Sequence, residues 1–316
     1  MKTCPLCHGS FSDSQKVCPK DSSPLEFIKV ENMTFKKNEL IDGRYKLVSL
    51  MGSGAFSEVW KCQDLHLKQF YAIKLLTFIA MDFEEIKDCV SRFFREADSA
   101  SRLGHENIVE VQFFGKDING QAYLVMEYLE GVSMTQYMDS CNCKAAIDRC
   151  VKMFIQVTKG MEAAHEVGIL HRDLKPDNIF ITCSTNRDVV KILDFGVAKI
   201  LHDEKLAEIS KDYMFGTPSY MSPEQVKGHA LDGRTDIYSL GIIMFELFSG
   251  GLPFTGYTAQ VLLQHITKPP PNPSEKNSKI SKELSSIILK AMSKHLDNRY
   301  QSMKELGDAL SKYLEN

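Results

Sequence analysis

The sequence predicts an α+β body that is preceded by a small cysteine-containing head. Short strand-like apolar runs stand at residues 45–48, 59–60 and 70–74, and apolar residues recur at helical spacing over about 84–103. Residues 237–248 are apolar almost all round, which is typical of a helix buried on every side. The chain has 316 residues, so it can bury a large core without a disulfide framework.

Composition and charge indicate an ordinary globular protein. Hydrophobic residues make up 43% and charged residues 25% of the chain, which excludes a wholly disordered chain, a collagen and a coiled-coil rod. Lys and Arg number 38 against 41 Asp and Glu, and the net charge of -3 shows no basic excess for nucleic-acid binding. We therefore expect no nucleic-acid partner.

No segment of the sequence is expected to span a membrane. A spanning helix needs about 20 mostly apolar residues, and the most apolar stretch, 237–248, is interrupted by Ser239, Gly241 and Glu246. The N-terminus lacks the apolar core of a secretory signal. We therefore expect a cytoplasmic protein with no membrane partner, in which the scattered cysteines are free thiols.

Three parts follow one another along the chain. Residues 1–21 form the cysteine-containing head, residues 22–43 are a polar linker with weak periodicity, and the body begins at residue 44. Within the body, the segment 269–273 contains four prolines. Because proline supplies no backbone donor and blocks a helix, we expect an extended surface loop there.

The head has the ligand spacing of a zinc site. A Cys-Pro-x-Cys unit supplies Cys4 and Cys7, and a Cys-Pro-x-Asp unit that starts eleven residues after Cys7 supplies Cys18 and Asp21. Zinc prefers four tetrahedral ligands and accepts a carboxylate among thiolates. His8 is an alternative fourth ligand, and a redox pair or a head that binds nothing is the other interpretation. So short a segment has no room for a core, so the metal would supply its fold.

A glycine pair follows the first strand of the body. Gly52, Ser53 and Gly54 let the backbone approach a phosphate with no Cβ in the way, although a hairpin turn is the alternative. Dinucleotide-binding fingerprints continue into a helix, whereas here Val59 and Trp60 continue as a strand. A Rossmann-type turn is therefore disfavoured.

A lysine and a glutamate are candidates for an ion pair beside a phosphate. Lys74 ends an apolar strand run, where it would ordinarily point to solvent. On the helix predicted over 84–103, Glu96 lies three positions from Phe93, at the edge of the apolar face, and can reach inward. The ion pair would have a functional role only if phosphates lie nearby. Otherwise Glu96 is a surface residue.

Four motifs in one fixed order decide between these interpretations. His-Arg-Asp-Leu-Lys-Pro-Asp-Asn occupies 171–178, and Asp-Phe-Gly at 194–196 begins sixteen residues after that motif ends. Gly-Thr-Pro at 216–218 and Ser-Pro-Glu at 222–224 follow. With this set the chain resembles the eukaryotic-like (Hanks-type) protein serine/threonine kinases, most closely their bacterial members, over about residues 44–315.

The resemblance implies a two-lobed protein kinase fold. Residues 44–126 would form the small lobe, an antiparallel sheet with one main helix, and residues 127–130 the hinge. Residues 131–315 would form the larger, mostly helical lobe, with ATP bound between the lobes. The head resembles the short zinc ribbons that precede some bacterial kinase domains, and it departs from them in having Asp21 where cysteine is usual.

The resemblance also implies the chemistry. The chain would transfer the γ-phosphate of ATP to Ser or Thr hydroxyls of protein substrates, with Mg²⁺ or Mn²⁺ as the metal. Asp173 would accept the proton of the substrate hydroxyl, and Lys175 would steady the γ-phosphate. Lys74, paired with Glu96, would hold the α- and β-phosphates. The residues expected to bind the nucleotide are Gly52, Ser53, Gly54, Val59, Ala72, Lys74, Glu127 and Leu129, and those expected to hold the metal are Asn178 and Asp194.

Other residues take structural or regulatory roles in the resemblance. Arg299 would pair with Glu224, and His171 and Asp236 would be structural rather than catalytic. Met126 would be the gatekeeper next to adenine.

Three departures from the family pattern concern the glycine loop and the activation segment. Ser57 stands where a third glycine is usual, and Ser222 where alanine is usual. The segment between Asp-Phe-Gly and Gly-Thr-Pro has few hydroxyls, of which Ser210 is the candidate for a regulatory phosphate that could pair with Arg172. Thr217 is expected to position substrate.

Two other functions stay open beside the active protein kinase. A pseudokinase scaffold would bind nucleotide only and recruit partners through its head, but such chains typically lose residues of the Lys74, Asp173 or Asp194 type, and all three are present here. A small-molecule phosphotransferase of the same fold is disfavoured by Gly-Thr-Pro and Ser-Pro-Glu, which build a platform for a peptide substrate.

Overall fold

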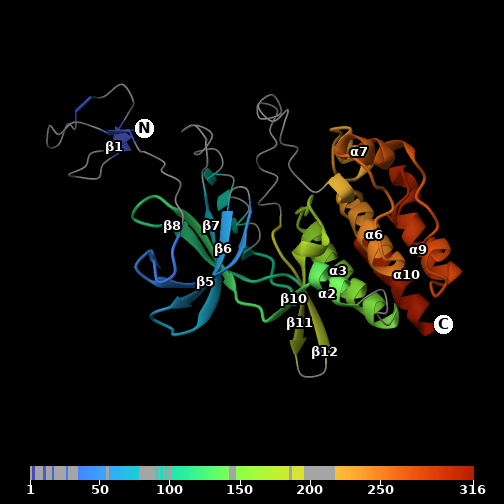
Figure 1. Cartoon of the computed structure of the whole chain (residues 1–316), viewed down its shortest axis with the longest axis horizontal. Helices are drawn as coiled ribbons and strands as arrows, with labels where there is room; N and C mark the ends of the chain where they lie inside the picture. Colours follow the sequence, from blue (N-terminus) through green and yellow to red (C-terminus); the bar gives the residue numbers. More distant parts are fainter. Residues whose placement is uncertain are drawn as a thin grey trace. The chain divides into compact units, whose positions relative to one another are not determined.

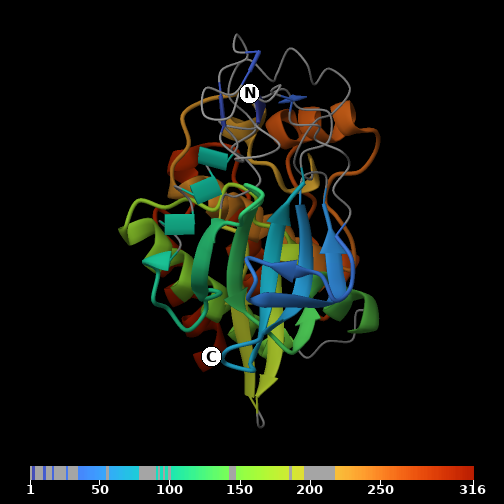
Figure 2. The ribbon, with the colours of Figure 1, turned by 90° about the vertical axis from the view of Figure 1, so that its left-hand side faces the viewer.

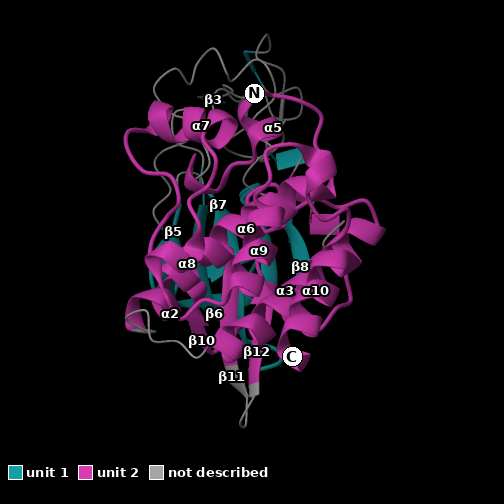
Figure 3. Ribbon diagram, turned by 90° about the vertical axis from the view of Figure 1, so that its right-hand side faces the viewer, with its two compact units in different colours: residues 1–91, 113–125 teal, residues 92–112, 126–316 magenta. Residues whose placement is uncertain are grey.

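The computed structural model describes most of the body and short pieces of the head. The described residues are 2–3, 10–11, 16–17, 26–27, 35–54, 57–77, 90–91, 93–94, 97–98, 101–141, 147–184, 187–195 and 218–316. The chain divides into two compact units, coloured separately in Figure 3, of which the first comprises residues 1–91 and 113–125 and the second residues 92–112 and 126–316.

The first unit is built on a six-stranded sheet, which faces the viewer in Figure 2. Its order is β4-β5-β6-β7-β9-β8, and the neighbouring pairs from β4 to β7 are antiparallel. Three two-residue strands form a separate antiparallel sheet in the order β2-β1-β3, in which β1 and β2 come from the head and β3 from the linker. The strands are β1 (Lys2–Thr3), β2 (Ser10–Phe11), β3 (Glu26–Phe27), β4 (Leu40–Ile41), β5 (Tyr45–Ser53), β6 (Ser57–Asp64), β7 (Phe70–Leu76), β8 (Val111–Lys116) and β9 (Ala122–Glu127).

Burial in this sheet follows the alternation of the sequence. In β5 the side chains of Tyr45 and Leu47 are buried, whereas those of Lys46 and Val48, which alternate with them, are only half-buried. This is expected when successive side chains point to opposite faces. The strand runs predicted at 45–48, 59–60 and 70–74 are thus confirmed as β5, β6 and β7. The core of the sheet consists of Ile41, Tyr45, Leu47, Trp60, Cys62, Ile73, Leu75, Tyr123 and Val125.

The second unit is mostly helical, and Figure 1 labels its main elements. It also has a three-stranded antiparallel sheet in the order β10-β11-β12. Its elements are β10 (Gly131–Ser133), α2 (Met134–Cys141), α3 (Ile147–Glu166), η1 (Pro176–Asn178), β11 (Ile179–Ser184), β12 (Arg187–Ile192), η3 (Pro218–Tyr220), α5 (Pro223–Val226), α6 (Gly233–Ser249), α7 (Thr258–Thr267), α8 (Pro273–Lys276), α9 (Lys282–Ala291), η4 (Leu296–Asn298) and α10 (Met303–Glu315).

Helix α6 is the centre of the second unit. It begins at the N-cap Asp232, whose side chain accepts a hydrogen bond from the backbone of Arg234, and ends at Gly250 in a left-handed conformation with φ of 78°. Nearly all of its side chains are buried, and it packs against α3, α9 and α10. The prediction of an all-round buried helix is therefore confirmed.

Two other predictions of local structure can be compared with the described residues. Val90, Phe93 and Ala97 are buried, which confirms the apolar face expected within 84–103. The expectation of a loop over the whole proline segment 269–273 was wrong at its last residue, because Pro273 is the first residue of α8. Proline fits that position, since the first helical residue has no hydrogen-bond partner for its N–H group to lose.

A buried ion pair joins α5 to the segment before α10, as predicted. The two guanidinium Nη atoms of Arg299 each donate to one carboxylate oxygen of Glu224 at 2.8 Å, and the Thr235 hydroxyl donates to the same carboxylate at 2.8 Å. Burial alone would raise the pKa of Glu224, but the hydrogen bonds and charge of Arg299 outweigh it and lower that pKa below its ordinary value.

We predict that Glu224→Gln lowers the free energy of unfolding by about 3–5 kcal/mol, because it leaves the buried Arg299 without a counter-charge. Urea denaturation of the whole chain measures this. The control is Glu166→Gln, which neutralises an exposed carboxylate and should change the value by less than about 0.5 kcal/mol. Equal effects of the two substitutions would contradict the assignment of the pair as a stabilising contact.

Candidate active site

The loop that follows α3 is held by one completely buried carboxylate. Asp236, in the first turn of α6, accepts hydrogen bonds from the backbone N–H groups of His171 at 2.9 Å and Arg172 at 2.8 Å. Its carboxylate also lies 2.8 Å from Nε2 of His165. Burial by itself would raise the pKa of Asp236, but the hydrogen bond and charge of His165 prevail and lower it. Asp236 therefore stays a carboxylate that fixes the loop backbone.

Two features show why His165 can approach Asp236. His165 lies in the last turn of α3, and a Cβ atom at Gly233 would lie 2.7 Å from its Nδ1 atom. Only glycine leaves this space free. Sequence analysis did not identify His165, and the signal that could have found it is weak: a histidine near a helix end, six positions before His171.

His171 connects the loop to the segment that follows β12. Its Nε2 atom lies 2.9 Å from the carbonyl oxygen of Leu193, and its ring packs against that of Phe195 in a tilted arrangement, with centroids 5.1 Å apart. The backbones of Arg172 and Asp194 have positive φ values of 63° and 55°, a conformation that residues other than glycine rarely adopt. Such strained positions persist where surrounding contacts fix them, and they cluster at functional sites. These contacts agree with the structural role expected of His171.

Three of the predicted catalytic-loop residues lie together. The Nζ atom of Lys175 is 3.5 Å from a carboxylate oxygen of Asp173, and both side chains are partly exposed. The side-chain amide of Asn178 donates to the carbonyl oxygen of Asp173 at 2.9 Å, and the carbonyl oxygen of Asn178 accepts from the N–H of Leu193 at 2.8 Å. The loop is thus tied to the residue immediately before Asp194.

In the first unit, strand register places three predicted nucleotide-binding residues in one row. Gly52 of β5 pairs with Val59 of β6, and Val59 pairs with Lys74 of β7. The glycine turn is closed by a hydrogen bond from the Gly54 N–H to the Ser57 carbonyl at 2.7 Å, and a Cβ atom added at Gly52 would meet nothing within 4 Å. Lys74 is buried, with 5% of its surface exposed, so the expectation of an ordinary solvent-facing lysine does not hold.

The side chain of Glu127 makes contacts that the sequence did not indicate. Its carboxylate accepts from Nζ of Lys191 at 2.7 Å and from the N–H of Glu110 at 2.8 Å. Its own N–H donates to the Glu110 carbonyl oxygen at 3.0 Å. Of the two backbone groups of Glu127, these contacts occupy the N–H and leave the carbonyl for another partner. Lys191 shares no motif with Glu127 from which the ion pair could have been deduced.

Several predicted site residues lie outside the described residues. They are the four proposed zinc ligands Cys4, Cys7, Cys18 and Asp21, the ion-pair candidate Glu96, and the activation-segment residues Ser210 and Thr217. Among the residues that the structure describes, no group of three or more His, Cys, Asp or Glu side chains could hold a metal ion. The same residues include no helix long and apolar enough to cross a bilayer.

Comparison with known families agrees with this arrangement. The family model described as "Protein kinase domain" matches residues 45–309. The chain belongs to the protein kinase family. The family predicted from the ordered motifs, and with it the two-lobed kinase fold, is therefore confirmed.

Curated and solved relatives are bacterial kinases. The chain is 35% identical to the probable serine/threonine-protein kinase PknB of Lactococcus lactis, over 83% of this chain and 41% of that protein. It is 38% identical to the serine/threonine-protein kinase Pkn1 of Myxococcus xanthus, over 85% of this chain and 38% of that protein. The chain thus spans about two fifths of these relatives. The PknI kinase domain of Mycobacterium tuberculosis aligns with a TM-score of 0.68 and 27% identity, over 88% of this chain and 99% of that one.

We predict that Asp236→Asn slows phosphate transfer by about 10²-fold, because a small displacement of the loop misplaces Asp173. The affinity for ATP should stay nearly unchanged, since the hydrogen bonds of Asp236 within the described residues go to the loop backbone and His165. Radiolabelled phosphate incorporation and a nucleotide titration measure the two quantities. Asp148→Asn removes an exposed carboxylate of α3 and is the control. A parallel loss of ATP affinity would show that Asp236 does more than position this loop.

Proposed function

We propose that the chain is an ATP-dependent protein serine/threonine kinase, which transfers the γ-phosphate of ATP to Ser or Thr hydroxyls of protein substrates. The observation that carries the proposal is the loop in which Asp173, Lys175 and Asn178 lie together, held from beneath by the buried Asp236. Phosphoryl transfer needs mainly positioning and neutralisation of charge. A fixed carboxylate beside a lysine supplies both.

The roles proposed within the loop are those that the resemblance implies, and the chemistry of the groups supports them. Asp173 would orient the substrate hydroxyl and accept its proton, because its carboxylate is partly exposed and can reach an incoming side chain. Lys175, 3.5 Å away, would neutralise the charge on the phosphate as it moves. The ion pair between the two side chains keeps both in place before substrate binds.

The proposed nucleotide site uses the row of residues in the first unit. The buried Lys74 would hold the α- and β-phosphates and pair with Glu96, and the open face of Gly52, Ser53 and Gly54 would cover the phosphates. Val59 and Ala72 would contact adenine. The carbonyl of Glu127 and the backbone of Leu129 would hydrogen-bond to adenine. Glu127 would use its carbonyl because its own N–H group already donates to the carbonyl oxygen of Glu110.

The donor set suits Mg²⁺ or Mn²⁺. The amide nitrogen of Asn178 donates to the Asp173 carbonyl, which leaves the amide oxygen as the atom available to a cation. Asp194 would supply a carboxylate, and hard oxygen ligands suit hard divalent cations. When bound, the metal would neutralise the charge of the phosphates. The protein holds the two ligands close in space through the bond between Leu193 and Asn178.

The proposal extends to substrates, location and control. Protein substrates with Ser or Thr acceptors, a partner at the head and a cytoplasmic location are the expectations that accompany a kinase of this type. Ser210 would be phosphorylated to regulate activity through Arg172. The lobe boundaries are proposed as 44–126, 127–130 and 131–315. The pseudokinase alternative retains no sequence feature in its favour, since Lys74, Asp173 and Asp194 are all present.

We predict that Asp173→Asn lowers the transfer rate by roughly 10²–10⁴-fold with little loss of ATP affinity, because the amide cannot accept the proton. Initial rates with a generic basic protein substrate and a nucleotide titration test this. Lys74→Met and Asp194→Ala serve as comparisons and should lose activity through phosphate and metal binding, respectively. Unchanged turnover in Asp173→Asn, or transfer that persists in excess chelator, would refute the proposed mechanism.

We also propose that the head binds one zinc ion through Cys4, Cys7, Cys18 and Asp21. The support is the repeated Cys-Pro-x-ligand unit, which puts a metal-ligating residue type at each end of two similar four-residue segments of the sequence. A carboxylate in place of a thiolate should make the site weaker than one of four cysteines, because zinc is borderline soft. The kinase body has its own core, so its nucleotide binding should not depend on this metal.

We predict about one zinc per chain in the purified protein, none in Cys18→Ser, and tighter retention against chelator in Asp21→Cys. Elemental analysis of these proteins and of a chain lacking residues 1–30 gives the comparison. Zinc that is absent from the wild type, or present equally in the shortened chain, would rule the site out.

A further inference from the structure

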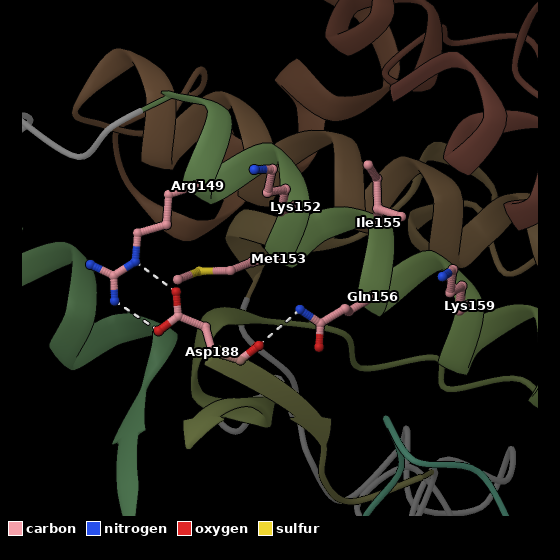
Figure 4. Close-up of a pocket in the computed structure, with 7 residues that line it drawn as sticks. All are labelled: Arg149, Lys152, Met153, Ile155, Gln156, Lys159 and Asp188. Carbon is pink, nitrogen blue, oxygen red and sulfur yellow. Dashed lines mark hydrogen bonds and ion pairs between the residues drawn. The ribbon is translucent and has the colours of Figure 1, made fainter. Parts of the chain in front are cut away.

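A hollow of about 490 Å³ lies on the second unit, away from the loop of Asp173, between helix α3 and strand β12 (Figure 4). The proposed kinase function uses none of its residues. Its wall is formed by four polar side chains of α3, an apolar pair on the same helix and one carboxylate of β12. These residues are Arg149, Lys152, Met153, Ile155, Gln156, Lys159 and Asp188.

The wall of the hollow is fixed by hydrogen bonds within the protein. Arg149 binds the carboxylate of Asp188 through two nitrogen atoms at 2.6 and 2.8 Å, and both side chains point toward each other in Figure 4. Gln156 donates to the Asp188 carbonyl at 3.1 Å and accepts from the Val190 N–H at 3.0 Å. Its amide oxygen also accepts from the side chain of Asn107 at 3.1 Å. Binding of a ligand would therefore cost little conformational entropy in these side chains, because they are already held in place.

The hydrogen bonds of Gln156 also decide whether a ligand can bind to backbone groups of β12 or only to side chains. β12 is the edge strand of its sheet, and an edge strand commonly accepts a further strand through backbone hydrogen bonds. Here Gln156 occupies the carbonyl of Asp188 and the N–H of Val190. Addition of a strand to β12 is thus blocked at this point, and recognition must come from side chains.

The free charge of the hollow is positive. The only carboxylate among its lining residues, Asp188, is neutralised by Arg149, which holds the pKa of Asp188 below its ordinary value. Lys152 and Lys159 are exposed, and within the described part of the chain neither has a carboxylate at ion-pair distance. Two uncompensated lysines two turns apart on one helix stand out in a chain whose net charge is -3.

The spacing of the lining residues suits an extended peptide. Residues 149 and 159 are ten positions apart on α3, a separation of about 15 Å along the helix axis. An extended chain advances about 3.3 Å per residue, so four or five residues would cover this length. The half-buried Ile155 and, beneath the surface, Met153 offer an apolar contact between the charges.

We infer that this hollow docks an extended acidic segment, with apolar side chains among its carboxylates, of a protein that the chain phosphorylates. Carboxylates of the segment pair with Lys152 and Lys159, and an apolar side chain contacts Ile155. Exposed ion pairs contribute little energy each, so docking is weak and serves mainly to steer and retain the partner. That this partner is a substrate rests on the proposed function; the binding itself needs no phosphate transfer.

The test is fluorescence anisotropy of a labelled octapeptide with the sequence Glu-Ser-Leu-Ser repeated twice, in which Glu and Leu share one face of the extended chain, titrated with the full chain. We expect saturable binding that weakens with salt, and a loss of about tenfold or more in affinity for the double variant Lys152→Glu/Lys159→Glu. The matched control, Lys276→Glu/Lys279→Glu, makes the same change in net charge at exposed positions elsewhere and should bind as the wild type does. A peptide with Gln in place of Glu should bind poorly to all three proteins.

A second measurement locates the peptide. Hydrogen exchange with and without the octapeptide should show protection in α3 and β12 of the wild type only. Saturable binding that is unaffected by the double variant, or equal binding of the Gln peptide, would overturn the docking site, as would no binding at all. Loss of phosphate transfer with binding intact would instead remove the proposed function and leave the site standing.

Discussion

The carboxylate of Asp236 is the interaction on which the candidate active site depends. A charge that is completely buried is costly unless every lone pair finds a donor. Here the donors are the backbone N–H groups of His171 and Arg172, together with the ring of His165. The same bonds that compensate the charge therefore fix the catalytic loop to α6. Because α6 is itself buried on nearly all sides, it gives the loop a rigid base.

A second buried network uses the two residues before Asp236, at the same end of the helix. The carbonyl of Arg234 and the hydroxyl of Thr235 bind Arg299 and Glu224, respectively. Three consecutive residues, 234 to 236, thus connect the start of α6 with α5 on one side and the catalytic loop on the other. Both networks consist of buried charged groups that are paired and hydrogen-bonded. Removal of a single partner should therefore lower the free energy of unfolding by more than the intact pair contributes to it.

The hollow at α3 and β12 follows a different principle. Its charged groups are at the surface, where each pair is weak, and its shape is maintained by Arg149 and Gln156 rather than by a buried charge. The opposite end of α3 carries His165, which contacts Asp236. One helix therefore supports the catalytic loop at its last turn and presents a basic surface over residues 149–159. This separation allows docking and catalysis to change independently by mutation.

The sequence by itself determined the family, the strands β5 to β7, the buried character of α6, and the roles expected of Asp173 and Asn178. This was possible because motifs and periodicity are local properties. A run of residues indicates the secondary structure that the run itself forms and the chemical groups that it carries. The sequence also suggested the Arg299–Glu224 pair, but only through resemblance. The proposed zinc ligands and the role of Glu96 stay predictions.

Only the tertiary structure decided which distant groups meet. The contact of His165 with Asp236 joins residues 71 positions apart, and that of Gln156 with Asp188 joins residues 32 apart. No pattern within either segment specifies such a partner, since the meeting depends on how helices and strands pack. The burial of Lys74 and the charge left over at Lys152 depend on packing in the same way, because a side chain's surroundings come from other elements.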